Sequence, residues 1–149
     1  MIPLIVMLAG WVAFRLAGAG GLLQAAGSWS GALRFALALI FALTGVAHFI
    51  PRGRAEMVRM VPPRLPRPDL LVTLTGMLEL LGAAGLLLPG LVQASAYALI
   101  ALLVAMFPAN VRAARTHLTV AGRPAMPLAL RLPLQLFWIS ALWWAARSA

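Results

Sequence analysis

The sequence of 149 residues is 63% hydrophobic and 10% charged, with a mean hydropathy of +0.97. Soluble domains average about 45–50% apolar and about 25% charged residues, so there is too little polar surface here to cover a soluble globule, and we expect an all-α membrane protein. The chain has no cysteine, which excludes disulfides, thiol redox chemistry, iron–sulfur clusters and thiolate metal sites.

The basic residues are all arginine, twelve in number, and they give a net charge of +9. Such a charge can indicate nucleic-acid binding, but these arginines cluster in connections beside apolar runs, without a nucleic-acid-binding motif. We therefore expect juxtamembrane charges that fix orientation, and no nucleic-acid partner. The two histidines, His48 and His117, lie far apart with no second ligand at helical spacing, so we expect no protein-held metal.

Five segments are long and apolar enough to span a bilayer, which takes about 20 residues. In chain order they are 2–24, 32–50, 69–88, 92–110 and 128–146. We expect residues 1–149 to form a single transmembrane domain. The first segment has a small-residue stretch near its end that is compatible with signal-peptide cleavage. However, it lacks a basic beginning and Arg15 interrupts its apolar run, so a retained helix is the better interpretation.

The connections between these segments differ in charge. Residues 51–68 carry five arginines against Glu56, residues 111–127 carry three, and residues 25–31 and 89–91 carry none. The positive-inside rule then puts both basic loops and the N-terminus in the cytoplasm. The lysine-free, alanine-rich composition fits a bacterial genome of high GC content, so we expect a multi-pass protein of the bacterial cytoplasmic (inner) membrane.

The longer basic loop contains its own helical pattern. Between Arg54 and Val61, Met57, Met60 and Val61 recur at helical spacing, with charged residues on the other side. This pattern predicts a short amphipathic helix in the interface, which ends at the prolines that follow. The loop serves either as a rigid turn into the third span or as a docking surface for a partner.

Polar groups inside the predicted spans are candidates for a site, because they are costly in a bilayer and face the bundle interior. At about 1.5 Å per residue, Glu79 lies about 15 Å and Arg15 about 19 Å from the basic side, so we expect similar depths. We expect a polar layer beneath Glu79, formed by His48, Asn110, Arg131 and Gln135. We also expect the glycines beside Thr44 and Thr75 to let neighbouring helices approach closely. The candidate ligand-binding residues are Arg15, Thr44, His48, Thr75, Glu79, Asn110, Arg131 and Gln135.

These groups support more than one interpretation. In a structural one, Glu79 pairs with Arg15 or Arg131 and the network only fixes helix neighbours. In a functional one, a buried cavity binds the polar head of an amphiphile such as a quinone. A proton or ion path is a third, although the chain lacks a ladder of carboxylates. The catalytic residues, if there are any, are not identified by the sequence.

Several short motifs occur in an order that resembles the DoxX-like integral membrane proteins. They are Gly45-Val-Ala-His-Phe-Ile-Pro51, Met60-Val-Pro-Pro-Arg-Leu-Pro66, Thr75-Gly-Met-Leu-Glu-Leu-Leu-Gly82, Phe107-Pro-Ala-Asn110 and Arg131-Leu-Pro-Leu-Gln135. The resemblance covers roughly residues 32–146 and implies a four-helix transmembrane bundle, to which the first helix is an addition. It also implies that His48, Glu79, Asn110, Arg131 and Gln135 match the recurrent motif residues.

The family's name comes from a subunit of a thiosulfate:quinone oxidoreductase. The resemblance therefore implies a protein that binds a quinone or lipid-like molecule and supports a redox partner at the 51–68 loop, with no covalently bound cofactor. One alternative is a non-enzymatic assembly or interaction protein with a purely structural polar network. A further alternative is acid/base catalysis on an amphiphilic substrate. The sequence leaves open whether the protein is an enzyme and whether it forms a homo-oligomer.

Overall fold

The computed structural model describes residues 2–116, 119–120, 123–124 and 126–148. These residues form six α-helices, one 3-10 helix and one two-stranded antiparallel ladder. In chain order the elements are α1 (Ile2–Ala19), η1 (Gln24–Ala26), α2 (Trp29–Ala47), α3 (Pro51–Met60), α4 (Pro68–Leu87), α5 (Val92–Arg115), β1 (Thr119–Val120), β2 (Arg123–Pro124) and α6 (Leu128–Arg147).

Five of these helices, α1, α2, α4, α5 and α6, are long and apolar enough to cross a membrane. The five predicted segments are therefore confirmed as helices, with shifted ends. α1 stops at Ala19 because Gly20 and Gly21 follow, and Gly21 adopts a left-handed φ of 76°. α2 begins early because the side chain of Ser28 accepts a hydrogen bond from Gly31 N at 2.9 Å, which caps the helix.

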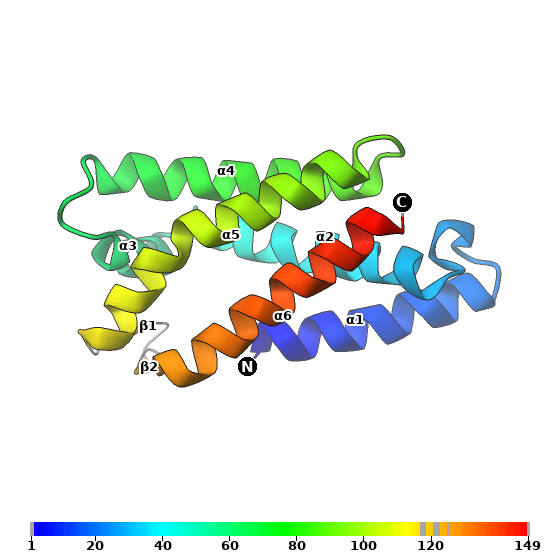
Figure 1. The fold of residues 1–149 in the computed structure, drawn as a ribbon, viewed down its shortest axis with the longest axis horizontal. Coiled ribbons are helices and arrows are strands. Elements are labelled where there is room, and N and C mark those ends of the chain that lie inside the picture. Colours follow the sequence, from blue (N-terminus) through cyan, green and yellow to red (C-terminus); the bar gives the residue numbers. More distant parts are fainter. Residues whose placement is uncertain (1, 117–118, 121–122, 125, 149) are drawn as a thin grey trace.

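The long helices run alternately up and down the long axis of the molecule (Figure 1). α2 contacts α4, α4 contacts α5, α5 contacts α6 and α6 contacts α2, so these four close a ring. α1 packs on the outside, mainly against α2 and η1. One end of the molecule carries α3 and the β1–β2 ladder, and the other carries η1 and the α4–α5 turn (Figure 1).

The interior of the ring is filled by small and aliphatic side chains, and large apolar side chains also cover much of the outside. Leu37, Leu86 and Leu142 are fully buried, whereas Leu81, Val104 and Leu136 are more than half exposed. An apolar exterior of this kind suits lipid, where helices associate through close packing rather than through exclusion of water. The outer face of the molecule therefore agrees with the apolar composition.

The predicted amphipathic helix of the 51–68 loop is confirmed as a helix, α3, which begins at Pro51 and ends at Met60. Two arginines attach it to its neighbours. Arg54 donates to His48 O at 3.3 Å and to Thr73 Oγ1 at 2.9 Å, and Arg112 of α5 donates to the carbonyl oxygens of Arg59 and Val61. The second basic loop, 111–127, is described only in part, and His117 lies outside the described residues.

Candidate functional site

A histidine and a glutamate lie opposite one another between α2 and α4. His48 is the residue that ends α2, and Glu79 lies in the middle of α4. They are 7% and 4% exposed, and His48 Nδ1 is 3.9 Å from Glu79 Oε2. Because His48 Nδ1 donates to Thr44 O at 2.9 Å, and a carbonyl can only accept, this nitrogen carries a hydrogen and Nε2 remains for another partner.

Two glycines allow this approach. A Cβ built on Gly76 would lie 2.6 Å from His48 Cβ, and one built on Gly45 would lie 2.9 Å from Leu80 Cγ. Real Cβ atoms do not come that close, so any larger residue at either position would push α2 and α4 apart. The expectation that glycines here let the helices approach is confirmed.

The carboxyl group of Glu79 is incompletely bonded. Oε2 is buried and has no hydrogen-bond partner among the described residues. Thr44 faces this carboxyl group, although its hydroxyl also donates to Phe41 O at 3.3 Å. At 3.9 Å, His48 Nδ1 is beyond hydrogen-bonding distance of Oε2. A buried acceptor without a donor lowers the stability of the fold by about 1–3 kcal/mol. This oxygen is therefore an unsatisfied group at the α2–α4 interface.

The expected proximity of Arg15 and Glu79 is wrong. Arg15 Cζ lies 5.4 Å from the centre of the ring of Trp29, which is the first residue of α2. Glu79 instead faces the last turn of that helix, fifteen residues further on, which is about 22 Å along the axis. The depth estimate counted from Ile2 at the basic side, but the start of α1 lies beside Leu134 and Trp138, well inside α6, so Arg15 is shifted toward the η1 end of the molecule.

His48 lies at the end of α2, as expected. We expected it near the cytoplasmic end of the second span, beneath Glu79. α2 ends at Ala47, and the chain then enters α3, so His48 packs against Gly76 in the middle of α4. Gly76 precedes Glu79 by three residues, about 4.5 Å along α4, so His48 lies slightly on the α3 side of Glu79 and its ring reaches to 3.9 Å from the carboxylate.

A second polar cluster joins α5 to α6. Arg131 donates from Nη1 to Asn110 Oδ1 at 2.7 Å and from Nε to Met126 O at 2.8 Å. The buried Gln135 donates to Leu103 O at 2.8 Å. All three predicted residues thus bond to protein atoms, and Arg131 does not form an ion pair with Glu79 in the described part of the chain.

The side chain of Gln135 extends from α6 toward the level of Glu79. A Cβ on Gly82 would touch Leu99, so in these antiparallel helices Glu79 of α4 lies near the level of Leu103 of α5. The side-chain amide of Gln135 reaches the carbonyl of Leu103, so this end of the side chain lies near the level of Glu79. Thr75 is separate from both clusters, because its hydroxyl donates to Leu71 O and Val72 O of its own helix.

An apolar groove of about 380 Å³ runs over the α2–α4 contact, with α1 as a third wall. Ala42 of α2 and Leu80 of α4 lie at the end of the groove nearest Thr44 and Glu79. Ala83, one helical turn from Glu79 on the same face of α4, is also part of the lining. Glu79 itself is not among the lining residues, which are Phe14, Phe35, Ala38, Leu39, Ala42, Leu80, Ala83, Ala84 and Leu87.

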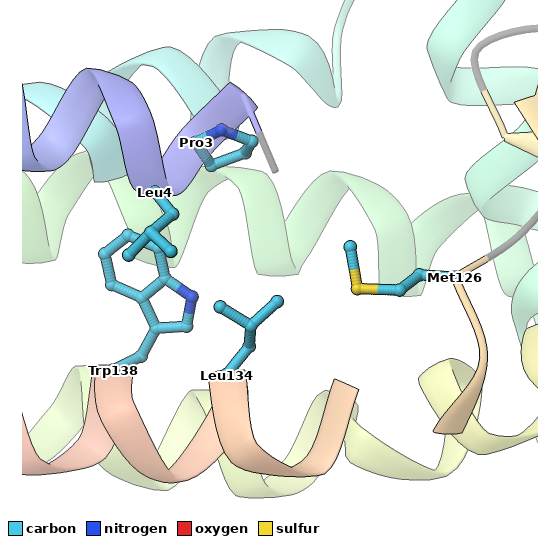
Figure 2. A pocket seen from close by; sticks show the side chains of 5 residues that line it. All are labelled: Pro3, Leu4, Met126, Leu134 and Trp138. Carbon is cyan, nitrogen blue, oxygen red and sulfur yellow. The ribbon is translucent and has the colours of Figure 1, made fainter. Parts of the chain in front are cut away.

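A smaller pocket of about 100 Å³ lies between the start of α1 and α6. Figure 2 shows Pro3 and Leu4 on one side and Leu134 and Trp138 on the other, with Met126 at the far edge. The nitrogen edge of the Trp138 indole is turned toward the space (Figure 2). The pocket is too small for most ligands, and its lining is largely apolar.

Two arginines with structural importance were missed by the sequence analysis. Arg34 lies in α2 with a buried Nε that has no partner among the described residues. It lies only two residues inside the predicted span 32–50 and is not among the candidate residues named from the sequence. Arg54 bonds to the carbonyl of His48, and no spacing in the sequence indicates that contact.

The described residues contain no group of three or more His, Cys, Asp or Glu side chains. The expectation that no metal is held by the protein is untested and stays a prediction.

Comparison with known proteins gives one result. Residues 37–147 match the model of a family described as Domain of unknown function (DUF8561). The chain belongs to this family. The DUF8561 match begins within α2 and includes His48, Glu79 and the Asn110–Arg131 pair, whereas α1 lies outside it. No curated protein and no solved structure matches the sequence.

Proposed function

We propose that this protein is an integral membrane protein that binds a quinone or a similar lipid-like molecule, with the polar head of the ligand at Glu79. The observation that carries the proposal is the buried Oε2 of Glu79, which has no hydrogen-bond partner in the described structure. A hydroxyl of a reduced quinone, or of another polar head, would donate to this oxygen. His48 Nε2 would serve as a second contact for the same head.

The apolar groove supports a ligand with a hydrophobic tail. It extends from Leu80 to Leu87 along α4, which is about 10 Å, and Leu80, the next residue after Glu79, lies at the end nearest the carboxyl group. The tail would occupy this groove between α1, α2 and α4. Leu80 packs over Gly45 between the groove and the polar pair, so this side chain has to move for the head to reach Oε2.

A quinone would supply the redox chemistry, and the protein's own groups would bind and orient it. The redox partner in this proposal docks at the 51–68 loop, whose arginines Arg52, Arg59, Arg64 and Arg67 are exposed. The ring of α2, α4, α5 and α6 is in this proposal a DoxX-like bundle, with α1 added outside it. The exclusion of α1 from the DUF8561 match supports that division.

The membrane and the orientation are part of the proposal. Nine of the twelve arginines lie in or beside the segments at the end of the molecule that holds α3 and the 111–127 connection. The other three lie toward the opposite end. With basic segments on the inside, the N-terminus is cytoplasmic and the C-terminus is outside, in a bacterial cytoplasmic membrane.

A second candidate function is a non-enzymatic assembly protein in which the polar groups are purely structural. The observation in its favour is the second cluster, because Asn110, Arg131 and Gln135 all bond to protein atoms. In that case Glu79→Gln should change stability alone, and replacing Arg52, Arg59, Arg64 and Arg67 should abolish capture of a partner.

The two functions are separated by equilibrium binding of decyl-benzoquinol to the purified full-length chain. Glu79→Gln replaces the carboxyl group with an amide, and we expect about tenfold weaker binding, since the loss of one partner of a buried hydrogen bond costs about 1–3 kcal/mol. Ala84→Trp should weaken binding by filling the groove from its exposed side. The matched control is Ala101→Trp, at an exposed position of α5 outside the groove. Unchanged binding in both Glu79→Gln and Ala84→Trp would rule out the proposed site.

A further inference from the structure

The end of the molecule that holds η1 and the α4–α5 turn has cations without acidic side chains. Arg15 on α1, Arg34 on α2 and Arg147 on α6 lie toward this end. The chain contains only three Asp or Glu residues. They lie elsewhere, with Glu56 on α3, Asp69 in the first turn of α4 and Glu79 in the middle of α4. No aspartate or glutamate is therefore placed to neutralise Arg15 and Arg34.

Both of these arginines have an unsatisfied donor. The Nε atoms of Arg15 and Arg34 are buried and make no hydrogen bond to any described residue. Both side chains are only partly buried, so the remaining N–H groups of each guanidinium are open to an external acceptor. Two helices that contact one another each contribute one such donor.

The depth of the two side chains fits the boundary between headgroups and acyl chains. Arg15 is four residues before the end of α1, and Arg34 is five residues after the start of α2, so they lie about 6 and about 7.5 Å from the helix ends. Arginines at this depth extend toward the interface. Leu16 and Val12 beside Arg15 are more than half exposed, which provides apolar surface for acyl chains.

Tryptophans mark the same level. The Trp11 and Trp29 rings meet edge to face with centroids 5.7 Å apart, and Trp11 Nε1 donates to Trp29 O at 2.8 Å. Trp144 of α6 meets the Trp11 ring at 5.6 Å. Tryptophan is enriched at headgroup level, where its ring is half apolar and half polar. The stacking of Arg15 on Trp29 at 5.4 Å holds that guanidinium within this layer.

We propose that Arg15 and Arg34 form a binding site for the phosphate group of a membrane phospholipid, at the end of the bundle opposite the basic loops. The planar guanidinium matches phosphate oxygens through paired N–H donors, which makes arginine suited to this anion. The phosphate accepts from the outer N–H groups of the two guanidinium ions, while each Nε stays enclosed by protein. This site is distinct from the Glu79 site and does not depend on its function.

The test is thermal unfolding of the full-length chain in neutral detergent with added lipid. Dioleoyl phosphatidylglycerol should raise the melting temperature by about 5 °C at saturation, and dioleoylglycerol, which has the same acyl chains without the phosphate, should not. The double variant Arg15→Gln, Arg34→Gln should lose most of this increase. Arg64→Gln is the matched control, because it removes an exposed arginine of the basic loop.

Three results would overturn the proposal. The first is equal stabilisation by dioleoylglycerol, and the second is equal stabilisation by inorganic phosphate, which would indicate a soluble anion. The third is a full phosphatidylglycerol effect in the double variant. If that variant does not fold, Arg15→Lys, Arg34→Lys keeps the charge but loses the paired donors and should show a reduced increase. The comparison of the two lipids on the unaltered chain remains decisive in every case.

Discussion

Gly76 sets the distance between the two helices that carry His48 and Glu79. We expect Gly76→Ala to destabilise the protein by about 1–3 kcal/mol, because its Cβ would lie 2.6 Å from His48 Cβ and the helices would have to separate. Thermal unfolding in detergent measures this effect. The change should also weaken decyl-benzoquinol binding, since it moves His48 away from Glu79.

The control for this substitution is Gly10→Ala in α1, where the nearest atom to the new Cβ is 3.6 Å away. Alanine is favoured over glycine in a helix by about 1 kcal/mol, so this variant should be neutral or more stable. A Gly76→Ala protein as stable as Gly10→Ala would mean that the α2–α4 contact is looser than described.

Asn110 and Arg131 should be energetically coupled across α5 and α6. Their side chains join at 2.7 Å, so a double-mutant cycle with Asn110→Ala and Arg131→Gln should give a coupling energy of about 0.5–3 kcal/mol. Unfolding free energies of the four proteins provide the measurement. Additive effects would show that the bond contributes nothing to stability.

At the scale of single residues, composition and spacing predicted which side chains are polar inside the spans but not which of them meet. Asn110 and Arg131 lie at the ends of two consecutive predicted spans that face the same side of the membrane. The sequence therefore suggested their contact. The depth of Arg15 depended on where α1 begins relative to α6, which the sequence does not show. An error of a few residues at a helix end moves a side chain by several ångströms, which is enough to exchange its partners.

At the scale of elements, Arg54 connects three helices. It donates to the His48 carbonyl at the end of α2 and to Asp69 O and Thr73 Oγ1 in α4, while itself belonging to α3. We expect Arg54→Gln to lower amide hydrogen-exchange protection in α3 by about tenfold, because the helix then opens locally at lower free energy.

Arg52→Gln is the control for Arg54→Gln, since Arg52 is an exposed arginine of the same helix. It should leave the exchange of α3 unchanged. Equal loss of protection in both variants would mean that overall charge, rather than the bonds of Arg54, holds α3 in place.

The elements themselves were the most predictable feature. Runs of about 20 apolar residues have few alternatives to a spanning helix, and all five were found as helices. α3 followed from the spacing of Met57 and Met60 and from the prolines after it. The extension of α5 beyond residue 110 to Arg115 was not predicted, because Pro108 near the end of the predicted span is normally a sign of helix termination.

At the scale of the whole molecule, the separation of charge predicts a topology that can be measured directly. The native chain has no cysteine, so single cysteines can be introduced at exposed positions without background. In intact bacterial cells, a membrane-impermeant maleimide should label Gln24→Cys, beside α1 and α2, and not Arg64→Cys, after α3. The reverse pattern would invert the proposed orientation, and labelling of both would contradict five membrane spans.

The central claim is that the unpartnered carboxyl oxygen of Glu79 receives the head of a lipid-like ligand. The most direct test is an experimental map of the protein purified in the presence of decyl-benzoquinol. We predict density for the head within hydrogen-bonding distance of Glu79 Oε2 and for the tail along Leu80 and Ala83. A map in which Oε2 bonds only to protein or water, with no ligand in the groove, would contradict the account.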